Sequence, residues 1–239
     1  MFRSLVLTAL CVALLAGLFL SAVQALSVVP IINAAEAFEI TQPELAPLQT
    51  DGHTHTHNAQ SWSPRDGIER VAFTVLANVL SAFGFSLILL VCMFVARDKG
   101  ALKISWLRGL VWGLAGYITF FVVPAFGLLP EIPGMEAAAI EGRQSWWLLA
   151  VVSTAIGIAL LAFLPGMAKV FAIIFIAAPW LVGAPQAALH GFLHPDLQAV
   201  ATLEGLQAQF IYATAIANGC FWLALGGLTG YAAKRFIKA

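Results

Sequence analysis

Five histidines carry the most recognisable chemistry in the chain. Three alternate in the run DGHTHTHN, as His53, His55 and His57, and two stand four residues apart in HGFLH, as His190 and His194. Alternate residues share one face of an extended chain and residues four apart share one face of a helix, so each group can present two or three imidazoles to one ion. Neutral imidazole binds zinc, copper, nickel, iron and cobalt, and the spacing does not choose among them. Both groups are therefore candidate metal ligands.

The composition requires a membrane to position these residues. The chain has 239 residues, of which 61% are hydrophobic and only 10% charged, whereas soluble domains carry about 25% charged residues. So few charges cannot cover a water-soluble globule, which excludes a cytosolic enzyme, and a net charge of +0 without a basic patch excludes a nucleic-acid binder. Three scattered cysteines imply no disulfide framework. We expect an all-α integral membrane protein with a single polytopic domain over residues 1–239.

Six apolar stretches are long enough to cross a hydrocarbon core of about 30 Å. The first also resembles a signal peptide and the fifth contains Pro179, so the count is five if the first is cleaved or the fifth does not span. Lys and Arg stay on the cytoplasmic side during insertion, and six spans with both termini inside leave only Arg65, Arg70 and Arg143 outside. We predict this topology. The predicted spans are 5–26, 71–96, 109–127, 146–164, 170–189 and 208–233.

The same topology places all histidines and nearly all acidic residues outside. The extracytoplasmic loop at about 36–70 contains the histidine run, and 190–206 contains the second pair. The histidine run could also be a solvated linker, and the pair could be ordinary loop composition. However, no histidine lies on the cytoplasmic face or within a predicted span, and this favours metal capture. Acidic residues contribute little to insertion, and a negative field concentrates cations. We predict an acidic outer mouth that includes Glu131, Glu136 and Glu141.

Polar residues within the spans are uncharged. Thr74 and Asn78 share a face of the second span, and Thr214 and Asn218 share a face of the last, both in the pattern Thr-x-x-Ala-Asn. Intramembrane polar groups usually face protein or water. One interpretation is an ion pathway, with the first and last hairpins repeated as in many transporters. The other is hydrogen-bonded helix packing, worth about 0.6 kcal/mol for each contact.

Two glycine pairs indicate close helix contacts. Gly109 with Gly113, and Gly226 with Gly230, are small-xxx-small pairs. Because such pairs let two backbones approach closely, we interpret them as packing positions.

Several segments resemble the CbtA family, the cobalt transporter subunits of bacteria. They are IERVAFTVLANVLSAFGFSLIL, RGLVWGLAGY, GLLPEIPGMEAAAIEGRQSWW, AAPWLVGAP and FWLALGGLTG, and the resemblance extends over nearly the whole chain. It implies an inner-membrane protein that takes up cobalt for cobalamin supply. It also implies a small single-span, histidine-containing partner, a CbtB-like subunit. Cobalt would be the transported ion rather than a permanent cofactor, and the residues themselves do not separate it from nickel or zinc.

The sequence also restricts the mechanism. No Gly-x-x-x-x-Gly-Lys-Ser/Thr loop is present for ATP hydrolysis, and no span has a carboxylate in its middle as a proton relay. We expect no catalytic residues. A rival hypothesis is a non-transporting, metal-responsive or scaffold subunit. An intramembrane metalloenzyme is disfavoured because no Glu stands between His190 and His194 as in H-E-x-x-H.

Overall fold

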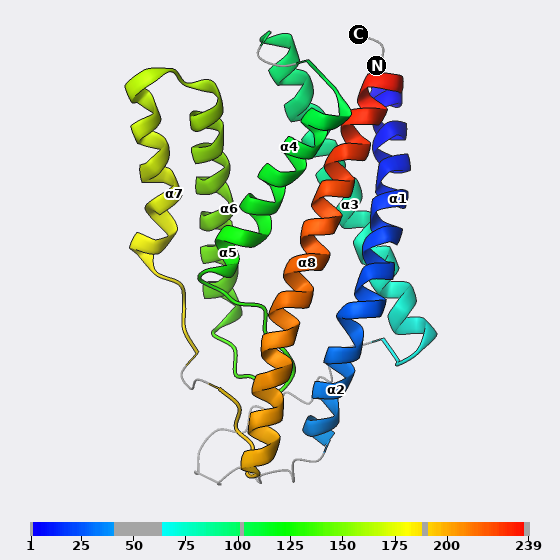
Figure 1. Ribbon diagram of the computed structural model, residues 1–239, viewed down its shortest axis with the longest axis vertical. Coiled ribbons are helices and arrows are strands. Elements are labelled where there is room, and N and C mark those ends of the chain that lie inside the picture. Colours follow the sequence, from blue (N-terminus) through cyan, green and yellow to red (C-terminus); the bar gives the residue numbers. More distant parts are fainter. Residues whose placement is uncertain (1, 41–63, 101–102, 188–190, 237–239) are drawn as a thin grey trace, which may run out of the picture.

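Long helices build the described structure (Figure 1). The computed structural model describes residues 2–40, 64–100, 103–187 and 191–236, except for the side chains of 39, 40 and 168, and no β-strand occurs in these ranges. The elements are α1 (Phe2–Ser27), α2 (Val29–Ile40), α3 (Ile68–Asp98), α4 (Trp106–Tyr117), the π-helix η1 (Ile118–Val122), α5 (Val123–Ala125), α6 (Ile140–Phe163), the 3₁₀-helix η2 (Gly166–Lys169), α7 (Val170–Val182) and α8 (Leu197–Phe236).

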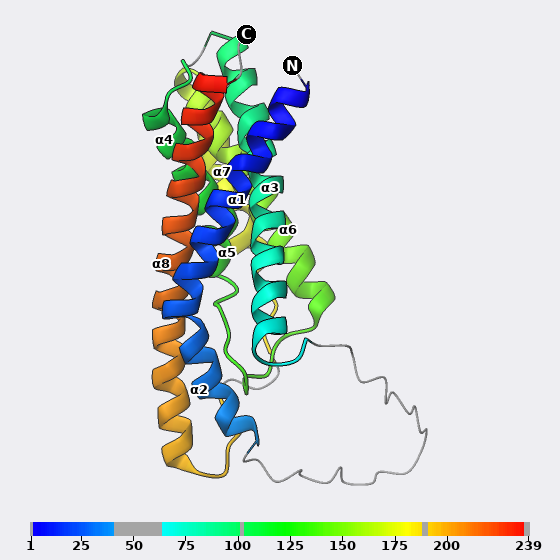
Figure 2. The same ribbon diagram turned by 90° about the vertical axis from the view of Figure 1, so that its right-hand side faces the viewer.

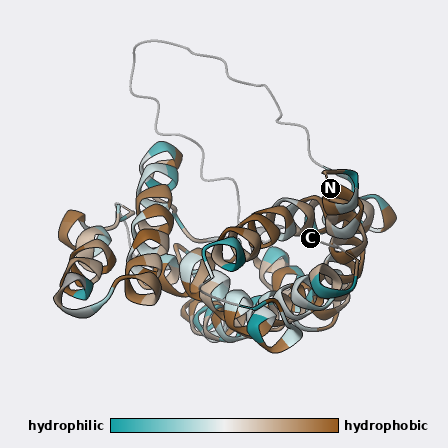
Figure 3. Ribbon diagram, turned by 90° about the horizontal axis from the view of Figure 1, so that it is seen from above, coloured by the Kyte–Doolittle hydropathy of each residue, from teal (hydrophilic) through white to brown (hydrophobic). Residues whose placement is uncertain are grey.

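Five helical stretches in the described ranges are long and apolar enough to cross a membrane: α1, α3, the run Trp106–Ala125, α6 and α8. Seen along the long axis, most of the helical ribbon is hydrophobic, and α6 and α7 stand as a pair beside the other helices (Figure 3). The expectation of an all-α, multi-pass membrane protein is therefore confirmed.

The stretch predicted as the fifth span, 170–189, is helical over only 13 residues. Helix α7 is therefore about 20 Å long, which is less than the roughly 30 Å of a hydrocarbon core. It ends because Gly183 has a φ of 81°, outside the right-handed helical region, and Pro185 follows. Helix α7 runs back along α6, and the chain continues beyond it to the far end of the molecule, where α8 begins (Figure 1). The return passage thus combines a short helix with non-helical residues.

Both ends of the described chain lie at the same end of the bundle. The Ser4 hydroxyl, in the first turn of α1, donates to the carbonyl oxygen of Phe236, the last residue of α8, at 3.2 Å. An even number of passages through the bundle requires this arrangement. Which side of the membrane they occupy stays a prediction.

A reporter fused after Ala239 tests that prediction. We expect a cytoplasmic-only reporter to be active there and a periplasm-only reporter to be silent, because the last turn of α8 carries Lys234 and Arg235. The reverse pattern would contradict the predicted orientation.

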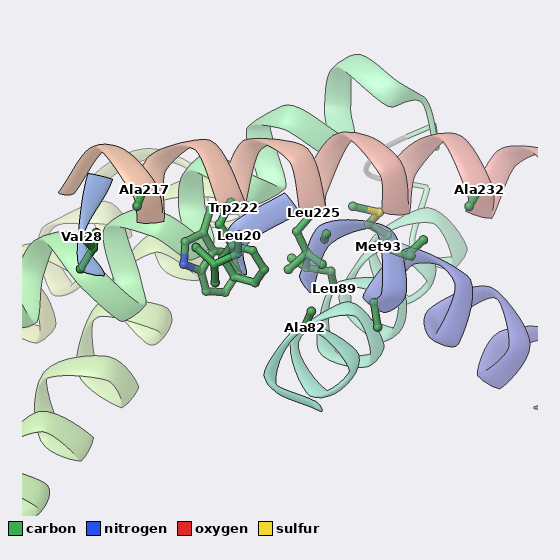
Figure 4. Packing of buried hydrophobic residues seen from close by; sticks show 13 residues of the cluster. Leu20, Val28, Ala82, Leu89, Met93, Ala217, Trp222, Leu225 and Ala232 are labelled. Atoms are coloured by element: carbon green, nitrogen blue, oxygen red, sulfur yellow. The ribbon is translucent and has the colours of Figure 1, made fainter. Parts of the chain in front are cut away.

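Helices α1, α3 and α8 surround the main hydrophobic core. Helix α1 lies between α3 and α8 (Figure 2), and Leu20, Leu89, Met93 and Leu225 meet in their shared interior (Figure 4). Next to them, the ring of Trp222 stacks on Phe120 of η1 with centroids 5.3 Å apart. This packing joins α1, α3, η1 and α8 into one unit.

Helices α4 and α8 cross in direct backbone contact at the two glycine pairs. A Cβ on Gly226 would overlap the carbonyl oxygen of Gly109 and lie 2.7 Å from the Cα of Gly113, and a Cβ on Gly230 would lie 2.9 Å from the Cα of Gly109. The packing interpretation is confirmed. The two pairs, predicted separately, face each other in a single contact.

Charge separates to the two ends of the bundle. One end of the bundle holds the first turn of α1, the connections from α3 to α4 and from α6 to α7, and the last turn of α8 (Figure 1). The charged residues of these segments are mostly basic, and those of the opposite end are mostly acidic. We call the two ends the basic end and the acidic end. The basic end carries Arg3, Arg97, Asp98, Lys99, Lys103, Arg108, Lys169, Lys234 and Arg235, and the acidic end carries Glu36, Arg65, Asp66, Glu69, Arg70, Glu131, Glu136, Glu141, Arg143, Asp196 and Glu204.

Candidate functional site

Most of the predicted histidine ligands lie outside the described residues: these are His53, His55, His57 and His190. Only His194 is described. Among the described side chains, no group of three His, Cys, Asp or Glu residues could hold a metal ion. The metal-ligand assignments therefore stay predictions.

His194 lies in the turn that leads into α8. Its Nδ1 accepts a hydrogen bond from the backbone N–H of Asp196 at 3.1 Å, and its ring meets the ring of Phe38 edge to face, with centroids 6.4 Å apart. Its Nε2 is buried and has no hydrogen-bond partner among the described residues. In this arrangement His194 shapes the start of α8, and only Nε2 is left to bind another group.

The three acidic residues predicted at the outer mouth differ in their surroundings. Glu131 pairs with Arg143, with 3.0 Å between Oε2 and Nη2, while Glu136 and Glu141 are exposed. The Glu131–Arg143 pair lies at a cavity of about 670 Å³ between η1, α5 and α6, whose other walls are mostly apolar and aromatic. Arg143 offsets part of the negative charge expected at this position.

Asn78 lies in a polar layer between α1 and α3. Its side-chain Nδ2 donates to the hydroxyl of Ser21 at 3.0 Å and to Oε1 of Gln24 at 2.7 Å. One turn earlier, the Thr74 hydroxyl donates to the carbonyl oxygen of Arg70 at 2.8 Å. We call Ser21, Gln24 and Asn78 the amide layer.

The corresponding pair on α8 makes different contacts. Asn218 donates to the carbonyl oxygen of Thr214 in its own helix at 3.0 Å, and the buried Thr214 hydroxyl has no hydrogen-bond partner in the part of the chain that the structure describes. Helix α7 packs on α6, whereas α1 packs along α3, so the first and last hairpins are not equivalent in the described structure. The shared sequence pattern thus does not produce a shared geometry. The physical reason is that α1 supplies polar partners for Asn78.

A cavity of about 360 Å³ at the acidic end adjoins the amide layer. We call it the polar cavity. Its walls come from α1, α2, the turn before α3, and the first two turns of α3. The polar or charged side chains that line it are Ser21, Gln24, Asn33, Glu36, Asp66, Arg70 and Thr74.

Ion pairs form part of the wall of the polar cavity. Arg70 binds Glu36 with two hydrogen bonds, Nη2 to Oε1 at 2.5 Å and Nη1 to Oε2 at 3.0 Å, and its Nη1 also binds Oδ1 of Asp66 at 3.2 Å. These charged residues were expected on the outer face, but their types and spacing indicated no role for them. Arg70 and Glu36 are 34 residues apart in the chain, so no local spacing could have indicated that they form an ion pair.

Gln207 of α8 is a second residue that the sequence analysis missed. Its Nε2 donates to the carbonyl oxygen of Pro130 at 2.6 Å, and its Oε1 accepts from the backbone N–H of Ile132 at 3.1 Å. An isolated antiparallel bridge between Met135 and Phe192 adds a further link. These contacts fasten the connection between α5 and α6 to the acidic end of α8.

The fold and this cavity define a class: a multi-pass α-helical membrane protein whose acidic end opens, through a charged cavity, onto a polar layer between two spans. The model of one family matches residues 2–234, and its description is probable cobalt transporter subunit. The chain therefore belongs to the CbtA family. Members of this family are transporter subunits rather than enzymes, and the word subunit implies a partner. Neither a curated protein nor a solved structure matches the chain.

Proposed function

We propose that the chain is the membrane subunit through which a divalent transition-metal ion, cobalt, enters a bacterial cell for cobalamin supply. It would lie in the inner membrane with both termini in the cytoplasm. The observation that carries the proposal is the polar cavity at the acidic end, because it would lead a cation from a negative surface to side-chain oxygens between α1 and α3. The family description supports the choice of cobalt.

Entry begins with electrostatic attraction. The acidic end raises the local concentration of cations, and the histidine run at 53–57 would capture a transition metal from dilute solution. The ion would then exchange water for carboxylate and amide oxygens in the polar cavity. An unpaired charge in a low-dielectric layer is very costly, so these ligands are needed where water ends.

The driving force would come from the membrane potential. A potential of 100 mV is worth about 2.3 kcal/mol for each charge, hence about 4.6 kcal/mol for a divalent ion. A small single-span, histidine-containing partner of the CbtB type would complete the transporter, and Glu131, Glu136 and Glu141 would contribute to the negative surface around the entrance.

Ion flux in proteoliposomes tests the proposed function. We expect the purified chain, alone or with its partner, to admit Co²⁺ to a trapped metal-sensitive dye when the lumen is negative, and empty liposomes to show no entry. Parallel runs with Ni²⁺ and Zn²⁺ measure selectivity. Binding of Co²⁺ without entry under both conditions would favour the metal-responsive or scaffold hypothesis instead.

Changing His53, His55 and His57 together to alanine tests the capture step. We expect uptake to fall several-fold at scarce metal and to be unchanged at plentiful metal, because a capture site raises local concentration without opening the path. The matched control changes the intervening Thr54 and Thr56 to alanine and should leave uptake unchanged. Equal uptake by both variants at scarce metal would make the run a linker.

A further inference from the structure

Arg70 links α3 to α2 in the wall of the polar cavity. Its guanidinium binds both carboxylate oxygens of Glu36 on α2, and one of its nitrogens also reaches Asp66 in the turn before α3. Such two-bond pairs between a guanidinium and a carboxylate fix geometry as well as charge. About one third of each of the Arg70 and Glu36 side chains is exposed, so water screens the pair only partly.

A neighbouring ion pair at the same end provides a contrast. Arg65 binds Glu69 at 2.9 Å, but the two residues belong to adjacent turns of one chain segment, and the Arg65 side chain is 91% exposed. Neither residue lines the polar cavity. The Arg65–Glu69 pair therefore does not link α3 to another helix.

We propose that Arg70 is a tethered cation that an incoming divalent metal ion must displace from Glu36 and Asp66 in order to enter the polar cavity. Two carboxylates carry two negative charges, which one divalent ion neutralises and one guanidinium does not. Carboxylate oxygens are ligands for both, so ion and guanidinium compete for the same atoms. The inference rests on the proposed function and names Arg70 as its gate residue.

The position of the pair matches this role. Arg70 and Glu36 share the cavity wall with Asn33 and Thr74, and Gln24 belongs to both the cavity wall and the amide layer. The cavity of about 360 Å³ has room for an ion with six waters, which fill about 180 Å³ at about 30 Å³ each. An ion that replaced the guanidinium would thus be next to the oxygens that lead to Asn78.

Binding of Co²⁺ to the purified full chain, measured by equilibrium dialysis, tests the proposal. The comparison uses the variant in which His53, His55 and His57 are alanine, so that the run does not dominate binding. Arg70→Gln should tighten Co²⁺ binding by about tenfold, the effect typical of a close charge pair. The control Arg65→Gln should leave affinity unchanged, and adding Glu36→Gln to Arg70→Gln should remove the gain. Equal affinity of Arg70→Gln and Arg65→Gln would overturn the proposal.

Two further measurements keep the test decisive. If Arg70→Gln does not elute as a folded protein, Arg70→Lys takes its place, because lysine keeps the charge but loses the two-bond fork. We then expect a smaller tightening than for Arg70→Gln, and no change would overturn the proposal. A tighter site in Arg70→Gln together with an absence of flux in every variant would reject the proposed function while supporting the competition between Arg70 and the ion.

Discussion

Replacing Gly226 with alanine is expected to force α4 and α8 apart and to lower the stability of the folded protein strongly. The added Cβ would overlap the backbone carbonyl of Gly109 and press on the backbone of Gly113, and backbone atoms cannot move aside as a flexible side chain can. Overpacking usually costs about 1–3 kcal/mol, and we expect the upper end of this range. The measurements are the monodisperse fraction in detergent and the thermal unfolding midpoint.

The matched control is Gly205→Ala in the same helix. Apart from the neighbouring backbone of α8 itself, no atom of the described residues lies within 4 Å of a Cβ at this position, so alanine should fit without strain. Alanine also has a higher helix propensity than glycine, which favours an unchanged or slightly raised unfolding midpoint. If Gly226→Ala behaves like Gly205→Ala, the backbone contact between α4 and α8 is not required for folding.

Asn78→Leu is expected to abolish Co²⁺ flux in proteoliposomes even at high external metal. Leucine removes the donor to Ser21 and Gln24 and replaces an oxygen-bearing side chain in the amide layer with an apolar one. An ion leaving the polar cavity would then meet no oxygen ligand from position 78, at a depth where a bare charge is very costly. The measurement is the initial rate of dye response at saturating Co²⁺.

Stability separates a pathway role from a packing role. Loss of interhelical hydrogen bonds alone costs about 0.6 kcal/mol for each contact, so Asn78→Leu should still insert, fold and bind metal outside. Asn218→Leu is the companion variant: the shared sequence pattern predicts that it blocks flux as well, whereas the described structure places Asn218 on α8, outside the amide layer. Normal flux in both variants, with only a lower unfolding midpoint, would assign these residues to helix packing and move the route to backbone carbonyls or to the partner.

The sequence by itself determined the class of protein and most of its spans. Hydropathy is a local property, and a run of about 20 apolar residues has few alternatives to a membrane helix. Most basic residues and most acidic residues lie at opposite ends of the bundle in the described structure, which agrees with the two faces that the predicted topology gave them. Gly109 and Gly226 were recognised as packing positions because small residues four apart leave a groove on any helix.

Only the tertiary structure decided which residues meet. Asn78 hydrogen-bonds to Ser21 and Gln24, which lie more than 50 residues earlier in the chain, and Arg70 pairs with Glu36, which lies 34 residues earlier. Neither contact follows from a local sequence pattern. The backbone conformation also sets the length of α7. Hydropathy extends the predicted fifth span to residue 189, but the positive φ of Gly183 ends the helix at Val182. Packing of α1 against α3 brings polar side chains together within a bilayer-sized core, where unpaired groups are costly, and that packing creates the candidate site.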